Sequence, residues 1–137
     1  VSANLLCWGG FEFEPLFLWN NSLYIDDTGS SIPVNHYYVK DILKISSTKD
    51  DQISMYNLYL SIQEIFTSID STIIELSKDD EMLIILTSGY RFFVRYSDYD
   101  LKLKEFTSVY DQFLLTQKSR KIRKNIDLRY PTGFAVQ

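Results

Sequence analysis

The chain has 137 residues, of which 45% are hydrophobic and 23% charged, and its formal net charge is −4. This composition is typical of one folded globular domain and excludes a disordered chain or a disulfide-stapled miniprotein. The negative charge disfavours nucleic acid as a partner, because its phosphates would be repelled. One cysteine, Cys7, and one histidine, His36, are too few for an internal disulfide or a Cys/His metal cluster.

The first half of the sequence predicts a β-hairpin and then a helix. Apolar residues 16–19 and 23–25 flank the turn residues 20–22. Thr48 and Asp51 have the spacing of a capping box, which predicts that a helix starts there. Its apolar stripe follows helical spacing over about four turns and consists of Met55, Leu58, Tyr59, Ile62, Ile65, Phe66 and Ile69.

The second half predicts three strands, a second helix and a terminal strand. The strands cover residues 72–74, 82–87 and 90–96, and apolar residues on both faces of 82–86 predict a central strand covered on each side. Ser97 and Asp100 predict the start of the second helix. Its apolar stripe consists of Leu103, Phe106, Val109, Tyr110, Phe113 and Leu114.

The last predicted strand runs over residues 126–130, is interrupted at Pro131, and resumes at 134–136. Proline lacks the amide hydrogen that a central strand needs, so we expect this strand at or near a sheet edge, or bulged. The sequence therefore predicts an α+β fold, with an antiparallel-rich β-sheet packed by two amphipathic helices.

The sequence contains few residues in arrangements that are typical of catalysis. His36 has no nucleophile motif to serve, and Cys7 has no basic neighbour to lower its pKa. Acidic pairs such as Asp26 and Asp27 fall where turns are expected. We therefore expect no catalytic residue, no metal, no cofactor and no small-molecule substrate. An exposed edge strand that recruits a partner strand is the binding mode that the pattern favours.

Two other functions remain open. The negative charge and ten tyrosines would also suit a small acidic inhibitor or immunity-type protein that blocks a basic partner. Such binding should weaken steeply with salt. A hydrolase that uses Asp26 or Asp27 would lose turnover in the corresponding asparagine variants.

Three stretches resemble the bacterial cell-division protein family FtsQ/DivIB. Residues 125–136, Asn-Ile-Asp-Leu-Arg-Tyr-Pro-Thr-Gly-Phe-Ala-Val, resemble its C-terminal signature. Residues 14–19, Glu-Pro-Leu-Phe-Leu-Trp, and 23–29, Leu-Tyr-Ile-Asp-Asp-Thr-Gly, resemble two earlier family stretches. The tryptophan that closes the family signature is absent, and Cys7-Trp8-Gly9-Gly10 replaces the last strand of the expected POTRA domain.

The resemblance implies a non-enzymatic scaffold of the divisome, active in septum assembly. Such a domain would bind FtsB and FtsL by adding a partner strand beside its terminal strand. The parent protein would be a single-pass inner-membrane protein, anchored by a missing N-terminal helix, with this domain on the periplasmic side. Residues 1–11 would be a remnant of the POTRA junction and 12–137 the β domain. The implied partner-binding residues are Arg129, Tyr130, Thr132, Gly133 and Phe134, together with Arg95 and its neighbour Tyr96 before the second helix.

Overall fold

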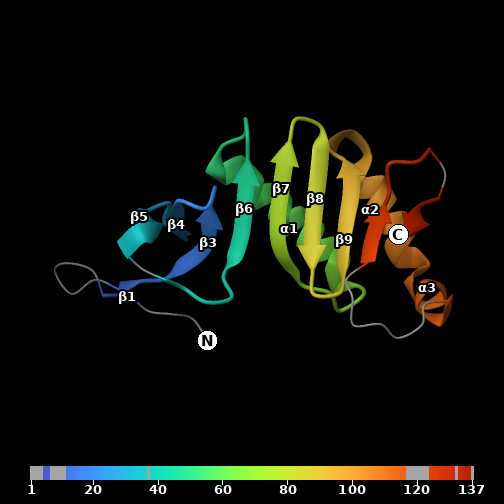
Figure 1. Cartoon of the computed structure of the whole chain (residues 1–137), viewed down its shortest axis with the longest axis horizontal. Helices are drawn as coiled ribbons and strands as arrows, with labels where there is room; N and C mark the ends of the chain where they lie inside the picture. Colours follow the sequence, from blue (N-terminus) through green and yellow to red (C-terminus); the bar gives the residue numbers. More distant parts are fainter. Residues whose placement is uncertain (1–4, 7–11, 37, 117–123, 132, 137) are drawn as a thin grey trace.

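The structure is a computed structural model that describes residues 5–6, 12–36, 38–116, 124–131 and 133–136. Its main sheet consists of β3 (Pro15–Trp19), β4 (Leu23–Asp26), β5 (Ser31–Pro33), β6 (Leu43–Ser47), β7 (Ile73–Asp79), β8 (Met82–Thr87), β9 (Tyr90–Arg95), β10 (Lys124–Asp127) and β11 (Ala135–Val136). The strand order is β11-β10-β9-β8-β7-β6-β3-β4-β5 (Figure 1). The short strands β1 (Leu5–Leu6) and β2 (Glu12–Phe13) form a separate two-stranded sheet.

Three α-helices accompany the sheet, namely α1 (Gln52–Thr67), α2 (Tyr99–Ser108) and α3 (Tyr110–Thr116). Two short 3-10 helices, η1 (Val34–His36) and η2 (Tyr96–Asp98), precede β6 and α2. Most neighbouring strands pair antiparallel, whereas β3 with β6, β6 with β7, and β9 with β10 are parallel. The predicted α+β architecture is confirmed.

The core lies between one face of the sheet and the described helices. Leu76, Ile85 and Phe92 are paired across β7, β8 and β9, and each is at most 1% exposed. They pack in one cluster with Ile62 of α1 and Phe106 of α2, both fully buried. The sequence folds this way because strand side chains alternate between faces, so every second residue meets the helices.

The opposite face of β8 is free of helices in the described part of the chain (Figure 1). Met82, Ile84 and Leu86 lie there and are half-buried, in alternation with the buried residues of the strand. The expectation that both faces of this strand are covered is therefore wrong. We call this side of the sheet the helix-free face.

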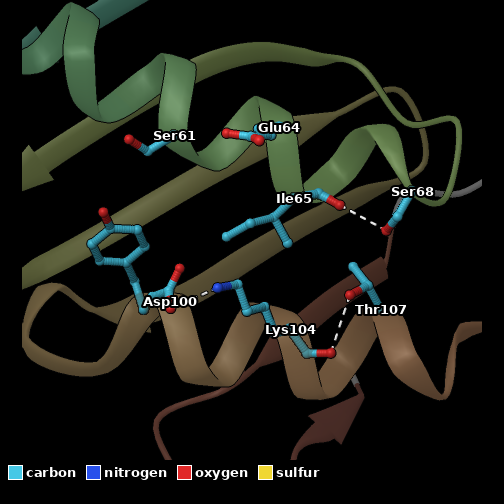
Figure 2. A pocket seen from close by; sticks show the side chains of 8 residues that line it. Ser61, Glu64, Ile65, Ser68, Asp100, Lys104 and Thr107 are labelled. Carbon is cyan, nitrogen blue, oxygen red and sulfur yellow. Dashed lines mark hydrogen bonds and ion pairs between the residues drawn. The ribbon is translucent and has the colours of Figure 1, made fainter.

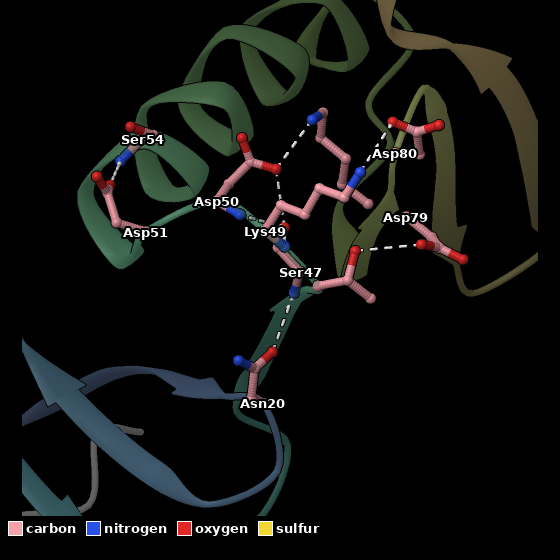
Figure 3. Close-up of polar contacts among 10 residues, drawn as sticks. Asn20, Ser47, Lys49, Asp50, Asp51, Ser54, Asp79 and Asp80 are labelled. Carbon is pink, nitrogen blue, oxygen red and sulfur yellow. Dashed lines mark hydrogen bonds and ion pairs between the residues drawn. The ribbon is translucent and has the colours of Figure 1, made fainter.

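The N-cap of helix α1 lies three residues later than the predicted cap at Thr48. Asp51 occupies the N-cap, and its carboxylate accepts the Ser54 backbone N–H at 2.7 Å. Thr48 instead donates to the Asp79 carboxylate on β7 at 3.1 Å, while Lys78 pairs with Asp50 at 2.9 Å (Figure 3). These contacts connect the loop after β6 to β7, so Thr48 serves tertiary structure rather than the helix end.

The second predicted helix is interrupted. Asp98 stands at the N-cap of α2 without a side-chain capping bond, so the predicted cap at Ser97 is wrong. The helix ends at Ser108, and Val109 leaves helical geometry with φ −112°. Phe113 of α3 still reaches the core, but Leu114 is 43% exposed and does not belong to the buried stripe.

Candidate partner-binding edge

Strand β11 forms one edge of the sheet, as predicted for the terminal strand. The backbone N–H groups of Lys124 and Leu128 donate to carbonyls of Gly89 and Phe93, so even-numbered residues of β10 face β9. Asp127 therefore faces β11, where it is paired with Ala135. Because backbone groups alternate along an antiparallel strand, those of Val136 face away from the sheet. Among the described residues, no strand pairs with the outer side of β11, so its outward backbone donors and acceptors are available to a partner strand.

The predicted final strand is shorter than expected. Regular pairing of β10 ends at Asp127, although the Leu128 N–H still donates to the Phe93 carbonyl at 2.8 Å. Pro131 lies in the turn between β10 and β11, outside both strands. The proline therefore neither ends nor bulges β10, and the chain returns as β11 after it.

Asp127 fixes the conformation of the residues that precede this turn. It is 7% exposed, and its carboxylate accepts the Arg129 Nε at 2.8 Å, Nη2 at 2.5 Å and backbone N–H at 3.0 Å. These hydrogen bonds hold the pKa of Asp127 below its ordinary value and raise that of Arg129. A bidentate ion pair of this kind restrains both side chains.

Arg129 is held on the helix-free face. Its guanidinium carbon lies 5.7 Å from the centre of the Phe93 ring, and Phe93 is paired with Asp127 across β9 and β10. The charge of Arg95 also helps to lower the pKa of Asp127. Asp127 therefore pairs directly with Arg129, and the charge of Arg95 on β9 acts on the same carboxylate, beside the β11 edge.

The other predicted binding residues have different surroundings. Tyr130 is 47% exposed, and Gly133 is exposed with φ +69°, a conformation that favours glycine. Thr132 lies outside the described residues. Phe134 is half-buried, with its ring 5.2 Å from Phe106 and 6.1 Å from Phe113, so it anchors β11 to the core.

Tyr96 is not grouped with Arg129. Its ring stacks on Tyr99 at 5.8 Å, and the ammonium of Lys78 on β7 lies 4.7 Å from its centre. The structure therefore places Tyr96 beside β7 and the start of α2. Of the two residues before the second helix, Arg95 is the one near the Asp127–Arg129 pair.

Two residues that support this edge were not predicted as site residues. Asp127 was part of the quoted signature, and only the structure shows that its carboxylate holds Arg129. Lys102 of α2 is 4% exposed, and its Nζ donates to the carbonyls of Tyr130 and Pro131 at 2.5 and 3.2 Å. Position 102 lies on the same helical face as the buried residues Leu103 and Phe106. A lysine on that face was the signal in the sequence that could have indicated a buried, hydrogen-bonded cation.

A polar groove lies between α1 and α2 (Figure 2). It has a volume of about 450 Å³, and Asp100 and Lys104 on its α2 side pair with each other at 3.0 Å. Thr107 and Ser68 bond to carbonyls of their own helices. These four side chains therefore already have partners within the domain.

Of the residues considered for catalysis, Asp26 has a structural role. The Asp26 carboxylate accepts the backbone N–H groups of Thr28 and Ser30 and so closes a turn. Cys7 lies outside the described residues. Among the residues that the structure describes, no group of three or more His, Cys, Asp or Glu side chains could hold a metal ion.

Comparison with known proteins identifies the family of the domain. Within the described part of the chain, no helix is both long and apolar enough to span a membrane. No curated protein matches the chain. A family model described as "FtsQ/DivIB, C-terminal related" matches residues 16–133, a region that includes the main sheet up to β10, the helices and the turn at Gly133. The chain therefore belongs to the FtsQ/DivIB C-terminal related family, which indicates a cell-division domain of the non-catalytic scaffold kind.

Proposed function

We propose that this domain is a non-enzymatic divisome scaffold that binds FtsB- and FtsL-type proteins by adding a partner strand beside β11. The observation that carries the proposal is the open edge itself, where the backbone of Val136 faces away from the sheet. Each added backbone hydrogen bond contributes about 0.5–1.5 kcal/mol. Side chains around the edge then supply specificity.

The proposed contact residues are those around the turn before β11. Tyr130 exposes a large aromatic surface, and truncating such an anchor costs about 2 kcal/mol or more when it is central to an interface. Arg129 and Arg95 offer cationic groups on the helix-free face. Gly133 lies in the same turn, Phe134 acts by holding β11 in place, and Thr132 is proposed from the family signature alone. Tyr96 takes a minor part in this proposal, because it packs on Tyr99 and Lys78.

Family membership supports the wider assignment. We place this domain on the periplasmic side of the bacterial inner membrane, in a single-pass protein that is anchored by an N-terminal helix. Residues 1–11 would then belong to the junction with a POTRA domain, and residues 12–137 to the β domain. The pairing of β1 with β2 crosses this boundary and so does not support it, although neither strand belongs to the main sheet.

A binding titration tests the strand-addition mechanism. We would titrate the domain with the extracytoplasmic segment of FtsB and compare Val136→Pro with Val136→Ala. Proline removes the outward N–H while the Ala135–Asp127 pairing remains possible, so we expect at least a tenfold loss of affinity. Alanine keeps the N–H and should bind within about threefold of the parent. Equal affinity of the proline variant and the parent would overturn the mechanism.

Salt dependence distinguishes this function from an acidic inhibitor. Strand addition should change little between low and high salt, because backbone hydrogen bonds and apolar contacts dominate it. Tyr130→Ala should weaken it in both conditions. A folded domain that does not bind FtsB, and instead binds a basic protein only at low salt, would favour the inhibitor hypothesis.

A further inference from the structure

Lys102 of α2 is a buried cation that donates to backbone carbonyls and not to a carboxylate of its own helix. Its Nζ lies between the carbonyl oxygens of Tyr130 and Pro131, at 2.5 and 3.2 Å. Among the described residues, no carboxylate forms an ion pair with it. By contrast, Lys104 on the same helix is exposed and pairs with Asp100. The positive charge of Lys102 is therefore stabilised by two backbone carbonyl dipoles of the turn that leads to β11.

The two ends of this contact differ in how firmly they are held. The α2 residues Leu103 and Phe106 are fully buried, so the helix that carries Lys102 is fixed in the core. Tyr130, Pro131 and Gly133 are all exposed, and β11 pairs with β10 at only two positions. Burying an ammonium group has a high desolvation cost unless its hydrogen bonds are made. The lysine thus favours the one arrangement of the turn that presents both carbonyls to it.

The turn is held from both sides of the sheet. Asp127 and Arg129 restrain the chain on the helix-free face, whereas Lys102 restrains the next two residues from the helix side. Two residues after Gly133, the chain re-enters the sheet at Ala135. The position of β11 therefore depends on a turn whose path is set by these two anchors.

We infer that Lys102 is a positioning residue that presets the β11 edge for a partner strand. The predicted effect of Lys102 on partner binding rests on the proposed strand-addition function. Its predicted effect on the unbound domain does not. A partner strand that meets a preset edge does not have to order the turn, so the lysine improves affinity without touching the partner.

The first test uses the unbound protein. In the parent, the Lys102 ammonium hydrogens should exchange with water at least tenfold more slowly than those of Lys104, measured by nitrogen-detected NMR. The Ala135 amide, which faces β10, should be protected from exchange. In Lys102→Met this protection should fall at least tenfold, while amides of β8 keep theirs. Lys104→Met is the matched control and should leave Ala135 unchanged.

The second test measures binding of the same variants to the FtsB segment. We expect about a tenfold loss of affinity for Lys102→Met and none for Lys104→Met. If Ala135 protection falls as expected but the parent does not bind FtsB, the positioning role stands and the proposed function fails. If the parent binds and Lys102→Met changes neither exchange nor affinity, the positioning role is overturned. Should Lys102→Met not fold, rapid exchange of the parent's Lys102 ammonium hydrogens would overturn it.

Discussion

At the scale of single residues, the candidate edge depends on charges held close to the backbone. The Asp127 carboxylate is almost fully buried and has both oxygens occupied by Arg129. Removing Arg129 would leave the Asp127 charge buried and uncompensated, whereas removing Asp127 leaves a guanidinium whose side chain is 40% exposed. The pair is therefore best regarded as a determinant of conformation, and its effect on stability depends on pH.

The pH dependence of folding tests this pair. The pKa of Asp127 in the folded protein lies below its ordinary value of 3.8, because Arg129 donates hydrogen bonds to the ionised form. Its stabilising contribution is complete above pH 3.8 and is lost as pH falls through the folded-state pKa. We expect Asp127→Asn to lower the urea midpoint near pH 6 and to flatten its decline below pH 4.

Asp50→Asn provides the comparison for that measurement. Asp50 also has a lowered pKa, from hydrogen bonds with Lys78 and Ser47, but it lies far along the chain from the edge. Its variant should likewise flatten the acid limb, while leaving FtsB binding at pH 7 unchanged. An Asp127→Asn variant with the full acid dependence of the parent would contradict the role assigned to the pair.

The sequence could predict some of these residues and not others. Tyr130 and Gly133 stand in a recognisable signature, and their exposure agrees with a surface role. The orientation of Phe134 was not accessible, because the partners Phe106 and Phe113 come from helices distant in sequence. Lys102 was missed for the same reason, since its carbonyl partners lie 28 and 29 residues away.

At the scale of elements, β11 is too short to hold itself in place by pairing alone. It has two residues, and the Phe134 ring just before it packs on α2 and α3. The position of β11 therefore depends on the packing of the Phe134 ring as much as on the backbone hydrogen bonds with β10. The edge strand and the second helix form one structural unit.

Phe134→Ala should separate this anchoring from the rest of the fold. The ring is half-buried, so we expect a loss of about 1–2 kcal/mol in unfolding free energy, less than the 3–5 kcal/mol of a fully buried phenylalanine. FtsB affinity should fall at least tenfold, because β11 loses its anchor. Urea denaturation and titration measure the two effects. Leu115→Ala, at a side chain 88% exposed, is the control, and equal effects of both variants would contradict the anchoring role.

Local patterns predicted the long elements better than the short ones. The α1 stripe was correct in Met55, Leu58, Ile62 and Phe66 because helical spacing extends over four turns. Strand β6 was not predicted, since its five residues pair in parallel with β3 and β7, and such pairing leaves little local signal. The break at Val109 was also missed, because a helical stripe continues through it in sequence.

At the scale of the whole molecule, the two edges of the sheet differ in their protection. The Val34 N–H donates to the Ser22 carbonyl, and the Asp26 N–H to the Ser30 carbonyl. By alternation, the backbone groups of Ser31 and Pro33 on β5 face outward. Proline provides no donor there, which is a common protection against edge-to-edge pairing. The β11 edge carries no such protection in its described residues.

The difference between the two edges predicts what happens when the proline on β5 is replaced. Pro33→Val restores an outward N–H on an exposed strand, so we expect the variant to self-associate at concentrations where the parent is monomeric. Sedimentation velocity over a concentration series measures this. Ser31→Val is the matched control, because it adds the same side chain to the same edge without adding a donor. If both variants associate equally, added apolar surface explains the effect; if neither does, Pro33 does not protect this edge. Association confined to Pro33→Val would mean that the missing backbone donor at position 33 is what prevents pairing at the β5 edge.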